Sequence, residues 1–215
     1  MENIFITFAI FFALRLMTLG YSIRNEKSIK KRGGIEYGKG NSLLLTIAHV
    51  AFYGSALYEA YITNASFDTF SYIGITFMLF AYLVLFYVIY KLHDIWTVKV
   101  YIVPNHRIER SFLFKHIKHP NYFLNIIPEL IGTAFLCHAW RTFVVLFPLY
   151  CILLFVRIRQ EEKAMHHLIW LSRNLVGDIF IIVLFFFPLY YGREISLSVS
   201  RVSSSQRSTS VFFNS

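Results

Sequence analysis

Long apolar stretches dominate the chain, and short polar segments separate them. Five stretches approach the ~20 mostly apolar residues that a membrane-crossing helix needs. They cover residues 3–21, 43–62, 70–90, 122–140 and 142–158. A shorter apolar run at 179–191 fits either a short sixth span or a re-entrant segment. The pattern therefore predicts an all-α integral membrane protein with five transmembrane helices and this additional short element.

The charged residues follow the same pattern. Only 15% of the chain is charged against 56% hydrophobic, whereas a soluble domain has about 25% charged residues. The net charge of +9 comes from basic segments at 21–41, 91–121 and 157–175, while 63–69 contains no Lys or Arg. This alternation fits the positive-inside rule and disfavours nucleic-acid binding. It places the N-terminus outside and predicts a cytosolic cofactor pocket between the second and third basic segments.

Domain organisation is simple in this interpretation. Residues 1–192 are expected to form one membrane domain, and the Ser-rich residues 193–215 a disordered tail. The first apolar stretch lacks a basic leading segment and a small-residue cleavage site, so we expect a retained helix. Four glycines between residues 33 and 40 follow no strand, so we expect a flexible cytosolic loop rather than a nucleotide-binding turn.

The fourth apolar stretch opens with His119-Pro120-Asn121-Tyr122. Proline suits the first turn of a helix, because its missing N–H would have no partner there. The free N–H groups of such a turn, with the helix dipole behind them, suit a carboxylate or another anionic group. His119 and Tyr122 can add hydrogen bonds or an aromatic surface. The alternative is that both residues only anchor the helix at the headgroup level.

A second polar pair ends the fifth stretch. Arg157 and Glu161 are spaced i, i+4 and therefore share one helix face. Arg157 can hold a substrate carboxylate or phenolate through two hydrogen bonds, and Glu161 can accept from an amine or a ribose hydroxyl. The alternative is an ordinary surface ion pair. Glu129, within the fourth stretch, is expected to face protein and to pair with an Arg. Arg15 is expected to extend its side chain to the membrane surface and to have no chemical role.

These motifs carry a resemblance to a known family. The runs Lys118-His119-Pro120-Asn121-Tyr122 and Arg157-Ile158-Arg159-Gln160-Glu161-Glu162-Lys163 occur in order, and Trp96 to Pro104 extends the match upstream. Together they resemble the isoprenylcysteine carboxyl methyltransferase (ICMT) family, closest to its small bacterial-type members. The resemblance implies S-adenosyl-L-methionine as the cofactor.

The resemblance also implies roles for individual residues. The implied cofactor contacts are His106, Arg107, Ile108, Glu109, Phe114, His119, Pro120, Asn121, Tyr122 and Glu161. Phe114 stands where family members often have an aromatic hydroxyl, which makes one cofactor contact apolar. Arg157 would orient the methyl acceptor, with Glu129 and Glu162 in supporting positions and no metal.

The favoured function is S-adenosylmethionine-dependent O-methylation of the carboxylate of an isoprenylcysteine-like or other lipid-soluble substrate at the cytosolic face. Its partners would be the lipid bilayer and a lipid-soluble or prenylated acceptor, in the plasma membrane of a bacterium or the endoplasmic reticulum of a eukaryote. Three alternatives stay open: O-methylation of a lipid hydroxyl such as a polyketide phenol, a sterol-reductase-like membrane enzyme, and a non-catalytic membrane scaffold. A di-iron oxygenase is disfavoured because repeated multi-histidine motifs are missing.

Overall fold

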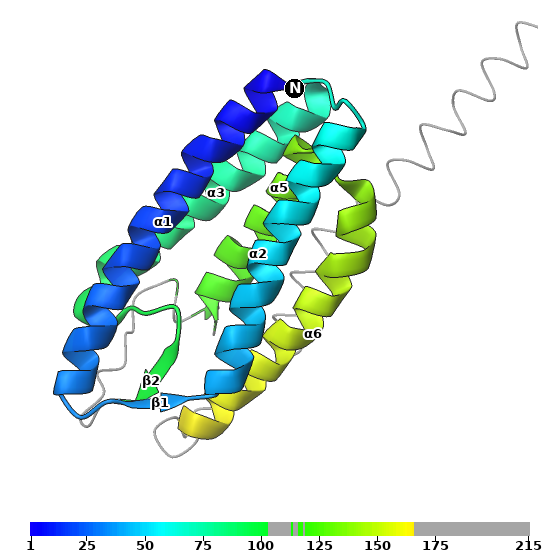
Figure 1. Cartoon of the computed structure of the whole chain (residues 1–215). Helices are drawn as coiled ribbons and strands as arrows, with labels where there is room; N and C mark the ends of the chain where they lie inside the picture. The colour runs from blue at the N-terminus through cyan, green and yellow to red at the C-terminus, as the bar shows by residue number, and fades with distance from the viewer. Residues whose placement is uncertain (103–112, 114–115, 118, 166–215) are drawn as a thin grey trace, which may run out of the picture. The chain divides into compact units, whose positions relative to one another are not determined.

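The computed structural model describes residues 1–102, 113, 116–117 and 119–165. Its elements (Figure 1) are α1 (Glu2–Lys31), β1 (Ile35–Tyr37), α2 (Lys39–Ile62), α3 (Thr69–Leu92), η1 (His93–Ile95), β2 (Val100–Ile102), η2 (Asn121–Ile126), α5 (Ile127–Leu136) and α6 (Trp140–Met165). The predicted short segment at 179–191 and the predicted tail lie outside the described residues.

Within the described part of the chain, four helices are long and apolar enough to cross a membrane. They are Glu2–Lys31, Lys39–Ile62, Thr69–Ile95 and Trp140–Ala164. Each contains one predicted apolar stretch, so the chain is a mostly helical, multi-pass membrane protein, as the sequence predicts. α1 continues about three turns beyond its apolar stretch. Asn25, Glu26 and Ile29 are buried in this extension, which lies in the basic segment 21–41, where no helix was predicted.

The remaining predicted span, 122–140, corresponds to η2 and α5. These two elements form a continuous helical segment, which begins as a π-helix and ends at Leu136. At its start Tyr122 contacts Glu161 near the end of α6, and at its other end the Leu136 carbonyl accepts from Ser71 at the start of α3. The segment thus runs from one end of the bundle to the other. It is not among the four candidate spans, so a count of five membrane-crossing helices stays a prediction.

Glycines allow α3 and α5 to pack closely. A Cβ atom on Gly74 would lie 2.6 Å from the carbonyl oxygen of Gly132, and a Cβ on Gly132 would lie 2.7 Å from the carbonyl oxygen of Gly74. Small residues at a crossing let the backbones of two membrane helices approach closely. Helix association in lipid depends on such close packing, because the hydrophobic effect does not drive it there. All ten residues of α5 are buried, so its neighbours cover it on every side.

An ion pair lies inside the helical bundle. Glu129 on α5 is fully buried and accepts a hydrogen bond from Arg15 on α1. The hydroxyl groups of Tyr53 on α2 and Tyr82 on α3 also donate to this carboxylate. The prediction that Glu129 pairs with an Arg is confirmed. The prediction that Arg15 extends to the membrane surface is wrong, because a buried carboxylate needs a nearby cation more than the guanidinium needs water.

A two-stranded sheet closes one end of the bundle. β1 and β2 pair antiparallel, with Ile35 opposite Ile102, Glu36 opposite Tyr101 and Tyr37 opposite Val100. The described elements are otherwise helical, consistent with the predicted all-α membrane protein, and this short sheet corrects only the prediction of a flexible glycine loop. Figure 1 shows it where α1 ends and α2 begins, and β1 also contacts the end of α6. Gly38 makes the turn from β1 into α2. Its φ of 65° is a left-handed conformation that residues with a side chain rarely adopt.

Candidate active site

Polar side chains meet at the end of the bundle that carries the sheet. His119 lies two residues before the start of η2, and Tyr122 lies in the first turn of η2. Pro120 is the N-cap residue of η2, where its missing N–H leaves no donor unpaired. A π-helical turn is wider than an α-helical one and is frequent at functional sites. Here it faces the last turns of α6, which carry Arg157 and Glu161.

Glu161 lies at the centre of this group. Its Oε1 accepts a hydrogen bond from the Tyr122 hydroxyl, and its Oε2 is 3.2 Å from Nδ1 of His119. The rings of His119 and Tyr122 stack with centroids 5.8 Å apart. Nε of Arg157 lies 3.6 Å from Oε1 of Glu161, so the predicted shared helix face of these two residues is confirmed. The structure therefore brings together four residues that the sequence analysis selected from two separate motifs.

Arg157 is buried, with 1% of its surface exposed. Its Nη1 donates to the Ser42 hydroxyl at 2.6 Å, and its Nη2 donates to the Val98 carbonyl at 3.1 Å. Its Nε donates to the Tyr122 hydroxyl at 3.3 Å. Ser42 was not selected from the sequence, and Val98, which lies in the matched run Trp96 to Pro104, was given no role in the site, because neither residue type signals a contact with a residue so distant along the chain.

The other predicted site residues differ in how far the structure describes them. Glu162 lies 3.9 Å from Nε2 of His119, at the edge of the group. The side-chain oxygen of Asn121 accepts a hydrogen bond from Asn125 at 3.0 Å, so Asn121 supports the helix start. Glu129 lies about two turns further along the segment, in the ion pair with Arg15. The predicted cofactor contacts His106, Arg107, Ile108, Glu109 and Phe114 lie outside the described residues.

A second polar cluster adjoins this site. The Glu26 carboxylate accepts from Lys30 at 2.7 Å, from Lys99 at 2.9 Å and from Tyr101 at 2.7 Å. Oε2 of Glu36 lies 3.0 Å from the same Tyr101 hydroxyl, so the two carboxylates share its single proton. Loss of water contact, together with the hydrogen bonds to two carboxylates, raises the pKa of Tyr101 well above its ordinary value, so its hydroxyl remains a donor at neutral pH. In the sequence, these residues appear only as charged and polar positions in separate segments, and such positions alone do not show that the side chains meet.

Unpaired acceptor atoms test whether the predicted cofactor suits this site. Nε2 of His119 and Oδ1 of Asn125, both at the start of the helical segment formed by η2 and α5, are buried without a hydrogen-bond partner among the described residues. Buried polar groups are normally paired, so a ligand with several donors fits here. The ammonium and ribose hydroxyls of S-adenosylmethionine are such donors, and Glu161 adds a carboxylate beside them. The described residues therefore fit this cofactor.

Comparison with known proteins agrees with this geometry. Residues 73–167 match the model of the isoprenylcysteine carboxyl methyltransferase (ICMT) family. An uncharacterised protein of Haemophilus influenzae is 57% identical over 163 residues, which are 76% of this chain and 95% of the relative. The chain belongs to the ICMT family. The matched residues include every member of the group around Glu161, and membership indicates a methyltransferase of the isoprenylcysteine type.

A more distant relative extends the comparison. The uncharacterised protein YpbQ of Bacillus subtilis is 28% identical over 158 residues, which are 73% of this chain and 93% of the relative. No solved structure matches the chain. Both relatives are bacterial and almost completely covered, which agrees with the predicted likeness to small bacterial-type members of the ICMT family.

Proposed function

We propose that this ICMT-family protein transfers a methyl group from S-adenosylmethionine to the carboxylate of an isoprenylcysteine-like or other lipid-soluble acceptor. The reaction takes place at the cytosolic membrane face. The observation that carries the proposal is the meeting of His119, Tyr122, Arg157 and Glu161 at one end of an apolar helical bundle. A non-catalytic scaffold would not need two motifs, about 40 residues apart, to form one buried polar group.

The cofactor side of the site consists of Glu161, His119 and the start of η2. S-adenosylmethionine supplies an electrophilic methyl group when it is bound. Glu161 accepts hydrogen bonds from the ligand, and the stacked rings of His119 and Tyr122 provide an aromatic surface beside it. The Tyr122 hydroxyl and His119 Nδ1 hold the Glu161 carboxylate in one orientation. This fixed geometry lowers the barrier by positioning rather than by acid–base chemistry.

Arg157 is the proposed acceptor-orienting residue. A guanidinium carries five N–H donors, and three of them have the acceptors described above. One N–H group on each terminal nitrogen remains for the two oxygens of an acceptor carboxylate. Because a carboxylate is already the nucleophile, Arg157 needs only to orient it, and no base has to remove a proton. Burial strengthens this contact because water does not compete for it.

The membrane supplies the other half of the substrate site. The outer faces of the helices expose large apolar side chains such as Ile10, Met17, Val50 and Leu83, which suit contact with lipid. A prenyl chain dissolved in the bilayer can therefore stay in lipid while its carboxylate reaches Arg157. The basic segments at this end of the bundle support the proposed cytosolic location of the site, because cytosolic segments carry an excess of Lys and Arg.

Calorimetry on the detergent-solubilised protein tests this proposal. S-adenosylmethionine and S-adenosylhomocysteine should bind the wild type, and Glu161→Gln should weaken binding about tenfold or more, because a hydrogen bond to a charged group is lost. Lys163→Ala, an exposed change two residues away, is the matched control and should bind as the wild type does. Methylation of N-acetyl-S-farnesylcysteine, compared with that of a lipid phenol, then identifies the acceptor class.

Failure has a clear meaning for this proposal. A well-folded wild type that binds neither sulfonium cofactor nor its demethylated product contradicts the methyltransferase function. Binding of a nicotinamide dinucleotide instead would support the sterol-reductase-like alternative. Turnover of the phenol but not of the farnesylated cysteine would replace the carboxylate acceptor by a hydroxyl.

A further inference from the structure

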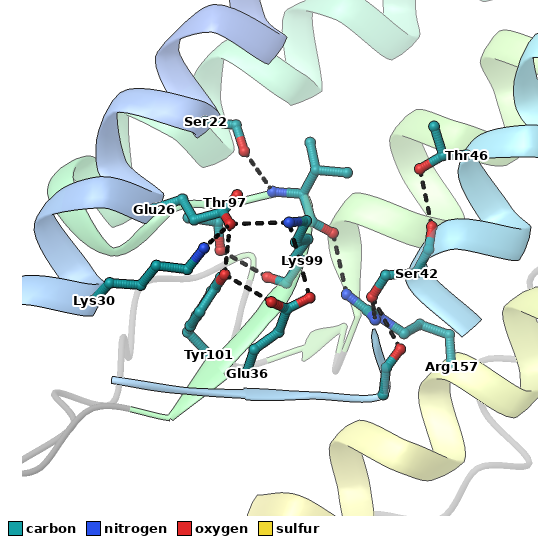
Figure 2. A network of polar contacts seen from close by, with 12 residues as sticks. Ser22, Glu26, Lys30, Glu36, Ser42, Thr46, Thr97, Lys99, Tyr101 and Arg157 are labelled. Atoms are coloured by element: carbon teal, nitrogen blue, oxygen red, sulfur yellow. Dashed lines mark hydrogen bonds and ion pairs between the residues drawn. The ribbon is translucent and has the colours of Figure 1, made fainter. Parts of the chain in front are cut away.

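The backbone of a single residue, Val98, connects α1 to the proposed acceptor-orienting residue. The N–H of Val98 donates to the Ser22 hydroxyl on α1 at 2.9 Å. The carbonyl of the same residue accepts from Nη2 of Arg157 on α6 at 3.1 Å. Figure 2 shows this connection between Ser22, at the α1 side, and Arg157, at the α6 side. Val98 therefore holds Arg157 at a position that α1 helps to define.

The segment around Val98 is held firmly on both sides. Nδ2 of Asn25 donates to the carbonyls of His93 at 2.8 Å and Trp96 at 2.9 Å. Beyond Val98, Lys99 and Tyr101 are fixed by the carboxylate of Glu26, as Figure 2 also shows. Three side chains from one face of α1, those of Ser22, Asn25 and Glu26, thus fix this segment.

Ser42 holds the other terminal nitrogen of Arg157. Its hydroxyl donates to the Gly38 carbonyl at 3.1 Å, which directs its lone pairs toward Nη1 of Arg157 at 2.6 Å. Because the hydroxyl proton is already used, Ser42 can act toward Arg157 only as an acceptor. The residue is 8% exposed, so little water is available to take its place.

These two neutral acceptors determine how Arg157 shares space with Glu161. An Arg and a carboxylate on adjacent helical turns would normally form a bidentate ion pair through the terminal nitrogens. Here the ion pair is formed by Nε, which lies 3.6 Å from Glu161, while Nη1 and Nη2 donate to Ser42 and Val98. The arrangement keeps Glu161 available to one ligand and the terminal edge of the guanidinium available to another.

We propose that Ser42 and Ser22 are positioning residues, which hold Arg157 apart from Glu161 so that its terminal nitrogens can bind the acceptor carboxylate. Ser42 acts directly on Nη1, and Ser22 acts through the Val98 carbonyl on Nη2. This proposal rests on the proposed methyl transfer. Neither serine touches the reacting atoms, so loss of either should affect the acceptor more than the cofactor.

The test compares four variants: Ser42→Ala, Ser42→Thr, Ser22→Ala and, as the matched control, Thr46→Val. Thr46 lies one turn after Ser42 on α2, and its hydroxyl bonds to the Ser42 backbone carbonyl instead of to Arg157. We measure the Kd of S-adenosylhomocysteine, and KM and kcat with N-acetyl-S-farnesylcysteine. We also measure inhibition by that acceptor's carboxamide, which lacks the negative charge.

In Ser42→Ala we expect the acceptor KM to rise about tenfold and the preference for carboxylate over carboxamide to fall by a similar factor, because one charge-assisted hydrogen bond is lost. Ser22→Ala should show the same change to a smaller degree. Ser42→Thr keeps the hydroxyl and should restore the wild-type KM. The cofactor Kd should stay within about threefold, because His119 and Tyr122 still hold Glu161.

The outcomes separate this proposal from the function on which it rests. If the wild type fails to bind S-adenosylhomocysteine, the methyltransferase function falls, and the role of both serines falls with it. If the wild type methylates the farnesylated cysteine while Ser42→Ala keeps its KM and its carboxylate preference, the positioning role is overturned and the function stands. An equal KM increase in Thr46→Val would also overturn it, because the effect would then come from general disturbance of α2.

Discussion

The ion pair between Arg15 and Glu129 leads to a sharp stability prediction. Arg15→Met removes the cation and leaves the Glu129 carboxylate, which is fully buried, with the hydroxyl groups of Tyr53 and Tyr82 as its donors. Methionine fills much of the space of the arginine stem and suits lipid, so the change isolates the charge. We expect a large loss of stability, because an unpaired charge would remain between helices.

The magnitude follows from burial. Removal of one partner of a buried ion pair typically costs about 3–5 kcal/mol, whereas an exposed pair contributes about 0–1 kcal/mol. The Arg15 side chain is 18% exposed and that of Glu129 is 0% exposed, so the cost for a buried ion pair applies. The two tyrosine hydroxyls soften the loss, so we expect about 3 kcal/mol. In the double variant Arg15→Met/Glu129→Gln, the amide keeps the tyrosine hydrogen bonds without the charge, and most of the stability should return.

Equilibrium unfolding in mixed detergent micelles, followed by far-UV circular dichroism, provides the assay. A double-mutant cycle over the two positions gives their coupling energy. Leu16→Met is the matched control, because Leu16 is 51% exposed on the next position of α1 and should change the stability by less than about 0.5 kcal/mol. If Arg15→Met also stays within about 0.5 kcal/mol of the wild type, with no coupling to Glu129, the reasoning is refuted.

Two further predictions concern helix packing and helix capping. Gly74→Val should destabilise the protein by about 3 kcal/mol or more in the same unfolding assay, because the valine Cβ would meet the backbone of Gly132. An unfolding midpoint equal to that of the wild type would argue against the close crossing of α3 and α5. Glu59→Ala should cost about 1–2 kcal/mol of stability and speed hydrogen exchange of the backbone amides at the start of α6. The reason is that Glu59 accepts hydrogen bonds from the backbone N–H groups of Arg141 at 2.9 Å and Thr142 at 2.8 Å. Unchanged exchange rates at these two amides would contradict the capping role.

The extent of the helices shows what a sequence pattern can and cannot predict. The apolar stretches 43–62 and 70–90 lie within α2 and α3, because hydrophobicity determines which residues enter lipid. The end of α1 was missed, since Asn25 and Glu26 look like loop residues when the segment they bind is unknown. Their burial comes from contact with residues about 70 positions later, which no local pattern contains.

The residues of the candidate site also fall into those that local motifs predict and those that only distant contacts reveal. His119, Tyr122, Arg157 and Glu161 were predicted because their motifs combine rare polar residues with membrane helices, where a polar group requires a reason. Ser42 was missed, because serine is common at the start of a helix and gives no sign of a partner on another helix. Arg15 was misassigned for a related reason: its partner lies 114 residues away, and the nearest polar environment along the chain was the basic loop.

The double attachment of Val98 also has a mechanical consequence. α1 presents apolar side chains such as Ile6 and Ile10 to its surroundings, so its tilt responds to the thickness of the hydrocarbon layer. Ser22 holds the Val98 N–H and Arg157 is bonded to the Val98 carbonyl, so two adjacent peptide planes, joined at the Val98 Cα, lie between α1 and the guanidinium. We therefore expect the geometry of this polar site to respond to the acyl-chain length of the lipids around the protein.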